Sequence, residues 1–178
     1  MGHSLLTKLL LPTLLRTAEE SNSDVRVVNV SSMAHQMAPG PGIIYDQDEL
    51  AQWNTWRRYG QSKLADLLTA RSLQQRYPQI TATSLHPGVI ATDLYSTSMS
   101  NPIMKAGWAF MGLFLMDVPY GTRTQLWCAT GPKEKVRQSY YWTPVAKKSG
   151  GSFWHAQKPK LADELWAWTE EELKKHGY

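Results

Sequence analysis

The sequence predicts an α/β fold in which helices cover both faces of a mostly parallel sheet. Two apolar runs, residues 25–30 and 80–85, have the composition of strands, and a segment with helical periodicity, residues 59–76, lies between them. Strand, helix and strand in this order form a βαβ unit, whose two strands run parallel. Further helical segments precede the first strand and follow the second, so helices are available for both faces.

Length and composition limit the kind of protein. The length of 178 residues predicts a single domain over residues 1–178. The 19 lysines and arginines are scattered among 15 acidic residues, which gives no support for nucleic-acid binding. One cysteine, Cys128, excludes an internal disulfide, and the five histidines lack the spacing of zinc ligands. We therefore expect no metal and a reducing compartment, the cytoplasm.

The segments before the central helix contain a leucine stripe, a strand and an insertion. Residues 2–17 carry leucines at 5, 6, 9, 10, 14 and 15, a helical spacing that Pro12 interrupts. Residues 25–30 are mostly apolar, as in a strand buried on both faces. Residues 33–58 form a long insertion with a Pro-Gly-Pro-Gly turn and two tryptophans.

The segments after the second strand are more variable. Residues 95–120 mix aromatic residues with methionines and leucines, which suits a lid over an apolar substrate and equally suits ordinary core. The longest apolar run, residues 106–116, is too short to span a bilayer, although contact with a membrane surface stays open. Beyond it we expect a helix over 121–130, a strand over 140–142, a loop over 147–151 and a helix over 161–175.

Tyr59 and Lys63 form the pair best suited to chemistry. Residues four apart on a helix lie on one face, about one turn apart, so the lysine ammonium lies beside the tyrosine phenol. A free phenol loses its proton only at about pH 10, but a nearby fixed positive charge favours the phenolate and makes proton transfer accessible. This spacing also occurs by chance on many amphipathic helices, so the assignment depends on the surrounding sequence.

Polar and turn residues follow both predicted strands. Ser31 and Ser32 come directly after residues 25–30, and Pro87 and Gly88 follow residues 80–85. Ligands of open α/β sheets bind at the carboxyl ends of the strands. We therefore expect Ser32 and the Pro-Gly turn to converge with the helical pair, while Ser31 and His86 serve as packed turn residues.

Three motifs occur in a specific order. They are Asn-Val-Ser-Ser at 29–32, Tyr-x-x-x-Lys in the form YGQSKLA at 59–65, and HPGVxxTxL at 86–94. Through them the chain resembles the short-chain dehydrogenase/reductase family, particularly its retinol-dehydrogenase-like and fungal members, from residue 2 to about residue 130. The resemblance implies the carboxyl-terminal portion of a Rossmann-like, doubly wound parallel sheet.

The resemblance also implies a reaction and the residues that perform it. The family's members are NAD(P)-dependent oxidoreductases that interconvert an alcohol and a ketone or aldehyde. In this chemistry Tyr59 protonates the carbonyl oxygen, Lys63 favours the phenolate and holds the nicotinamide ribose, and Ser32 orients the substrate oxygen. The aromatic segment over 95–120 favours a lipophilic small molecule as the substrate.

Cofactor contacts implied by the resemblance fall on the third motif as well as on Tyr59 and Lys63. The Val89 backbone and the Thr92 hydroxyl are expected to bind the nicotinamide carboxamide. The twelve glycines include no GxGxxG fingerprint, so the half that binds the pyrophosphate and distinguishes NAD from NADP is expected to lie outside this chain. The cofactor contacts in the third motif are Pro87, Gly88, Val89 and Thr92.

Two alternatives to a working oxidoreductase remain. The chain could be a truncated, non-catalytic remnant that cannot bind cofactor alone and acts as a dimerisation partner. A serine hydrolase is a more distant alternative, because Ser32 with His35 or His86 lacks a GxSxG elbow. In the chain as it stands, residues 25–30 are expected at an outer sheet edge, although the resembled fold places this strand centrally. Arg26 is their only charged residue, so we expect self-association.

Overall fold

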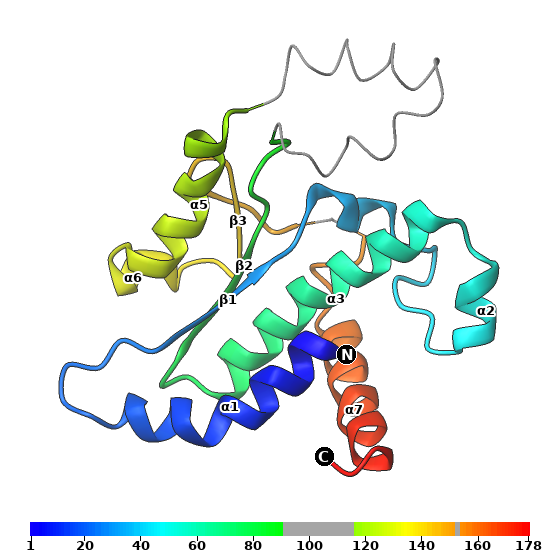
Figure 1. The fold of residues 1–178 in the computed structure, drawn as a ribbon, viewed down its shortest axis with the longest axis horizontal. Helices are drawn as coiled ribbons and strands as arrows, with labels where there is room; N and C mark the ends of the chain where they lie inside the picture. Colours follow the sequence, from blue (N-terminus) through cyan, green and yellow to red (C-terminus); the bar gives the residue numbers. More distant parts are fainter. Residues whose placement is uncertain (91–115, 152–153) are drawn as a thin grey trace.

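The computed structural model describes residues 1–90, 116–151 and 154–178, and its helices and strands alternate along much of the chain (Figure 1). Thr92 and most of the predicted lid over 95–120 lie outside the described residues. No helix within the described ranges is long and apolar enough to cross a membrane. The elements are α1 (Gly2–Ala18), β1 (Arg26–Val30), η1 (Met33–Met37), α2 (Gln47–Gln52), α3 (Thr55–Arg76), β2 (Thr81–Leu85), α5 (Val118–Thr130), α6 (Lys133–Val136), β3 (Tyr141–Thr143), β4 (Lys147–Lys148) and α7 (Pro159–Lys175).

The strands form one mixed sheet in the order β1-β2-β3-β4. The first three run parallel, with Val30 opposite Leu85 and Leu85 opposite Trp142. β4 runs antiparallel to β3, so the predicted loop over 147–151 is wrong at its first two residues. A tight turn brings Lys147 and Lys148 back alongside β3, and two exposed lysines carry no strand signal in the sequence.

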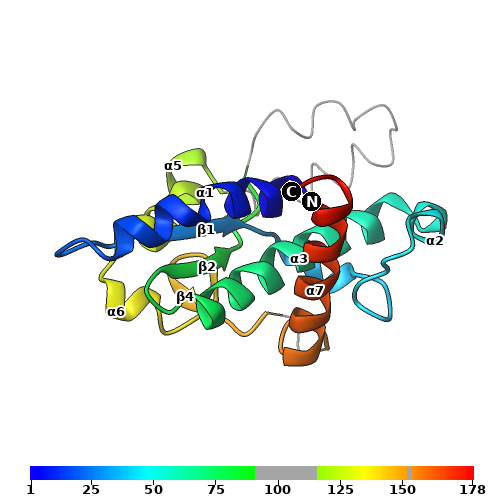
Figure 2. The ribbon, with the colours of Figure 1, turned by 90° about the horizontal axis from the view of Figure 1, so that it is seen from below.

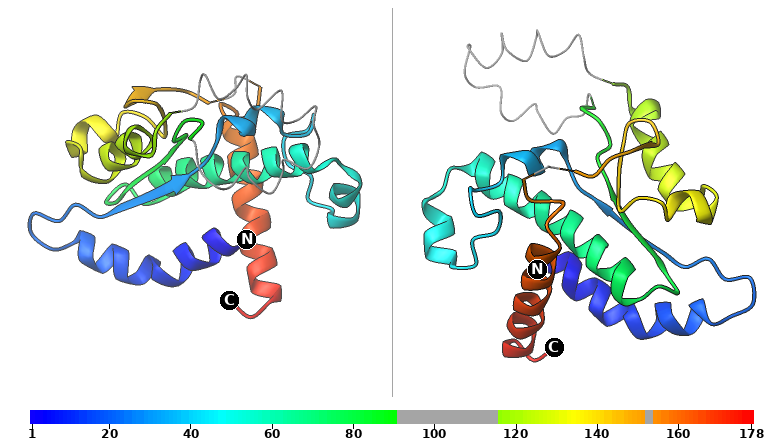
Figure 3. Two further views of the ribbon diagram at one scale, coloured as in Figure 1. Left: turned by 45° about the horizontal axis from the view of Figure 1, so that its top comes forward. Right: turned by 180° about the vertical axis from the view of Figure 1, so that it is seen from behind.

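Helices pack on both faces of the sheet, which confirms the predicted class (Figures 1 and 3). α3 and α7 lie on one side, and α5 and α6 lie on the other. Successive strand side chains point to opposite faces. Tyr141 accordingly joins the core of the α3 side, whereas Trp142 packs with Leu85 and Cys128 on the α5 side. The leucines of the α3-side core are Leu64, Leu67, Leu68, Leu161 and Leu165.

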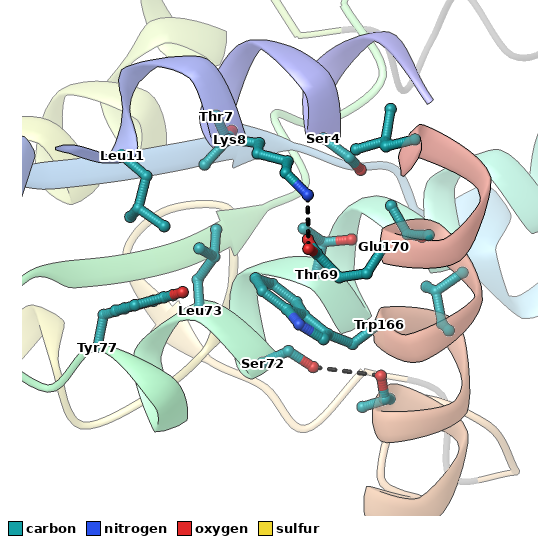
Figure 4. Close-up of a pocket in the computed structure, with 14 residues that line it drawn as sticks. Ser4, Thr7, Lys8, Leu11, Thr69, Ser72, Leu73, Tyr77, Trp166 and Glu170 are labelled. Carbon is teal, nitrogen blue, oxygen red and sulfur yellow. Dashed lines mark hydrogen bonds and ion pairs between the residues drawn. The ribbon is translucent and has the colours of Figure 1, made fainter. Parts of the chain in front are cut away.

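α1 lies beside α3 and α7 but packs loosely (Figure 2). None of its residues is buried, and the predicted leucine stripe is exposed at positions 6, 9 and 10. Lys8 Nζ forms an ion pair with Glu170 Oε2 at 2.6 Å, beside a cavity of about 120 Å³ between the three helices (Figure 4). Polar contacts therefore hold α1 in place more than apolar burial does.

β1 lies at an edge of the described sheet. Its residues are half-buried or exposed, whereas all five residues of β2 are buried. The prediction that residues 25–30 are buried on both faces is wrong, because four β1 residues are only half-buried and Val30 is exposed, whereas the position of β1 at an outer edge agrees with the prediction. The Arg26 side chain folds inward, donates to the carbonyls of Cys128 and Gly131, and is only 10% exposed. The only charged side chain of β1 therefore does not hinder pairing of this edge with another strand.

Candidate active site

α3 carries Tyr59 and Lys63 on one face. The helix begins at Thr55, four residues before the predicted start, because Asn54 Oδ1 caps it by accepting from the Arg57 backbone N–H at 3.0 Å. Lys63 Nζ lies 5.9 Å from the centre of the Tyr59 ring. The Tyr59 side chain remains accessible, with 41% of the residue exposed. The helical spacing thus brings an ammonium near a phenol that solvent or a ligand can reach.

Lys63 reaches the carboxyl end of β1. Its Nζ donates to the Val30 carbonyl at 2.9 Å and pairs with Asp66 Oδ2 at 3.0 Å. Its backbone carbonyl accepts a hydrogen bond from Ser31 Oγ at 2.6 Å. An ammonium has three N–H groups, so these contacts use two and leave one that can serve a phenolate or a ribose hydroxyl. The sequence-based interpretation missed Asp66, whose only signal was its i,i+3 spacing from Lys63.

Ser32 joins the end of β1 to η1. Its Oγ accepts from the Ala34 backbone N–H at 3.1 Å, a bond that uses a lone pair and not the hydroxyl proton. That proton is what the predicted role toward a substrate oxygen requires. Ser31, in contrast, is buried and donates its proton to the Lys63 carbonyl. The prediction of Ser31 as a packed turn residue agrees with this structural contact.

His35 does not activate the Ser32 hydroxyl. Its Nδ1 donates instead to the Ser32 backbone carbonyl at 2.6 Å, and its ring packs edge-on against Tyr141. His35 is buried, and this burial lowers the pKa of its imidazole despite the opposing effect of the bond to Ser32. The serine hydrolase alternative therefore gains no support from this histidine.

Gly60 lets η1 approach the turn of α3 that carries Tyr59. A Cβ at this position would lie 2.8 Å from three backbone atoms of η1 and the residue after it. Only a glycine allows this approach, which holds the segment following Ser32 against α3. Sequence reasoning missed this function. The available signal was a glycine inside a helix, where it costs about 1 kcal/mol relative to alanine. The three atoms are Ala34 O, Met37 C and Ala38 N.

The turn after β2 lies next to the end of β1, since the two strands are parallel neighbours. Gly88 has a φ of +103°, a conformation that other residues rarely adopt, and a Cβ there would meet Met116 Sδ at 2.6 Å. The Val89 carbonyl accepts from the Met116 backbone N–H at 2.8 Å. One of the two lone pairs of this predicted cofactor contact is therefore already used.

His86 begins this turn and is a packed residue. Its backbone N–H donates to the Trp142 carbonyl at 2.9 Å, and its Nδ1 is buried without a hydrogen-bond partner among the described residues. Burial and, to a smaller extent, the neighbouring His35 lower the pKa of the His86 imidazole to about 4. The ring is therefore neutral at pH 7.

The described residues fit one end of a nicotinamide dinucleotide. The third N–H of Lys63 suits a ribose hydroxyl, whereas the space beside the Gly88 Cα is occupied by the Met116 side chain. Gly42, the second glycine of the only GxG pair, has a φ of +95°, and a Cβ there would meet Leu161 and His155. That segment is a packed turn and not a phosphate-binding loop, so the fit covers the nicotinamide end alone.

The fold has a counterpart among solved structures. An uncharacterized protein from Mycobacterium paratuberculosis superposes with a TM-score of 0.60 and 29% identity, over 96% of this chain and 55% of that chain. Together with the parallel order of β1, β2 and β3, this confirms the predicted fold class, part of a Rossmann-like doubly wound sheet. No family model matches the chain.

Curated relatives cover nearly the whole chain. An uncharacterized oxidoreductase of Schizosaccharomyces pombe is 37% identical over 95% of this chain, and the chloroplastic short-chain dehydrogenase TIC 32 B of Brassica napus is 36% identical over 93%. Retinol dehydrogenase 12 of Mus musculus is 31% identical over 93%. The chain spans about half the length of these relatives, 51%, 52% and 49% respectively. Over nearly its whole length, the chain is thus a homologue of short-chain dehydrogenase/reductases.

Proposed function

We propose that this chain carries the catalytic residues of an NAD(P)-dependent oxidoreductase that interconverts an alcohol and a ketone or aldehyde. The observation that carries the proposal is the Tyr59–Lys63 pair, with its ammonium anchored at the carboxyl end of β1 close to Ser32. The oxidoreductase names of the relatives support the same general chemistry.

Each of the three side chains has a separate part in the reaction. The nicotinamide supplies or accepts the hydride when it is bound. Tyr59 gives its proton to the carbonyl oxygen during reduction and takes the proton from the hydroxyl during oxidation. The positive charge of Lys63 stabilises the phenolate that remains, and its unused N–H suits a ribose hydroxyl. Ser32 donates its hydroxyl proton to the substrate oxygen and so fixes the orientation of the substrate.

A lipophilic alcohol or aldehyde is the substrate class that we propose. The support is the name of the mouse relative, a retinol dehydrogenase, and the composition of residues 95–120. The composition favours an apolar molecule, and the relative's name adds an alcohol group that can be oxidised.

Titration of the chain with NADH and NADPH, followed by nicotinamide fluorescence, tests this proposal. We expect saturable binding that weakens about tenfold or more in Lys63→Ala, because this change removes the ammonium next to the ribose. The matched control is Lys160→Ala on α7, whose side chain is 90% exposed and pairs only at 3.6 Å with Glu164. Equal affinity in wild type and Lys63→Ala would overturn the assignment of Lys63.

A non-catalytic dimerisation partner is the second candidate function. The open edge of β1 favours it, because no described strand pairs with that side and Arg26 is turned inward. This candidate predicts self-association without nicotinamide binding, so the same titration separates the two functions.

A further inference from the structure

We infer that Asp66 is the positioning residue for Lys63, an inference that rests on the function proposed above. Asp66 lies one helical turn after Lys63 on α3 and is only 8% exposed. Its Oδ2 lies 3.0 Å from Lys63 Nζ, and its Oδ1 lies 3.0 Å from His3 Nδ1. Both oxygens of one nearly buried carboxylate therefore have partners.

An anchor is needed because a lysine side chain is flexible. Four carbons separate its ammonium from the backbone, so an unrestrained nitrogen samples many positions. Here two acceptors fix it from different elements, the Val30 carbonyl at the end of β1 and the Asp66 carboxylate on α3. This arrangement holds the third N–H at the edge of the sheet where Tyr59 and Ser32 lie.

Asp66 is itself held by neighbouring elements. Its backbone carbonyl accepts a hydrogen bond from Asn29 Nδ2 of β1 at 3.1 Å, and its side chain contacts His3 in the first turn of α1. Exposed ion pairs add little stability because both side chains move freely. Asp66 differs from them by its burial and by contacts to β1 and α1. The His3 side chain is 73% exposed, so we assign the anchoring to Asp66 and a lesser, supporting contact to His3.

Nitrogen NMR of the lysine ammonium tests the anchor directly. In a chain labelled with ¹⁵N-lysine, Lys63→Arg identifies the Lys63 signal, and we expect slow proton exchange at that ammonium. Asp66→Ala should speed this exchange at least tenfold, and Asp66→Glu should restore part of the protection. The matched control is Asp163→Asn, which breaks the exposed ion pair with Arg76. Unchanged exchange in a folded Asp66→Ala chain, checked by its backbone amide spectrum, would overturn the inference.

Titration of the same variants with NADH and NADPH tests the positioning role. We expect Asp66→Ala to weaken nicotinamide binding by a factor similar to that of Lys63→Ala. The double variant should be no weaker than Lys63→Ala alone, since the two residues act through one ammonium. If Asp66→Ala binds the nicotinamide cofactor as tightly as the wild type does, the positioning role is overturned. Absence of binding by the wild type would instead refute the proposed function, while the exchange measurement still decides the anchor.

Discussion

Replacing Gly60 by alanine should destabilise the protein although alanine is the better helix former. In an unconstrained helix the change gains about 1 kcal/mol. Here the new Cβ would lie 2.8 Å from backbone atoms of Ala34, Met37 and Ala38, and backbone cannot rotate away as a side chain can. Overpacking of this kind typically costs about 1–3 kcal/mol. Since this cost exceeds the helical gain over most of its range, we expect a net loss of up to about 2 kcal/mol and displacement of η1 from α3.

Urea unfolding followed by circular dichroism measures this change. The matched control is Gly2→Ala, because Gly2 also lies in a helix but a Cβ there would meet nothing within 4 Å. We expect the control to leave stability unchanged or to increase it. A Gly60→Ala protein at least as stable as the wild type would refute the proposed packing of η1 on α3.

Three further predictions concern pH, the sheet edge and a helix cap. The pKa of His86 is about 4 in the fold and about 6.5 in the unfolded chain, so the unfolded chain binds more protons between these values. The free energy of unfolding should therefore fall by up to about 3 kcal/mol as the pH drops from about 6.5 to about 4, and urea titrations should show a smaller fall in His86→Gln. Val30→Lys, at an exposed position of β1, should reduce the self-association that light scattering measures at rising concentration. A wild-type chain that stays monomeric would contradict self-association through the β1 edge. Asn54→Ala should cost about 1 kcal/mol through loss of the α3 cap, and an unchanged thermal midpoint would argue against that cap.

The main elements could be predicted because their signals are local. The apolar runs and helical periodicity gave β2, α3 and α7 to within a few residues of their observed bounds. The start of α3 was placed late because its first turn is exposed, carries no buried apolar residue, and is fixed by the Asn54 cap. β4 was missed because its two lysines pair through backbone groups, which leave no pattern in the side chains. The leucine stripe of α1 suggested more burial than the structure has, because a leucine pattern does not show whether another element covers it.

The candidate site was predictable where a helix fixes the spacing. Four residues along α3 bring Tyr59 and Lys63 to one face, and this followed from periodicity alone. Asp66 and Gly60 were not predicted, because their importance depends on contacts with α1, β1 and η1 that are distant in sequence. Tertiary neighbours decide which of several polar or small residues on a helix support the chemistry.

Turnover by a chimaera tests the proposed role of Tyr59 most directly. Because the chain spans about half the length of its relatives, it would be joined to the amino-terminal half of the Schizosaccharomyces pombe oxidoreductase. Oxidation of NADH or NADPH would then be followed with a panel of lipophilic aldehydes. We predict that Tyr59→Phe lowers kcat by about 10²–10⁴-fold, as loss of a general acid does, and leaves cofactor affinity nearly unchanged. Turnover retained in the Tyr59→Phe chimaera would contradict the assignment of Tyr59 as the proton donor.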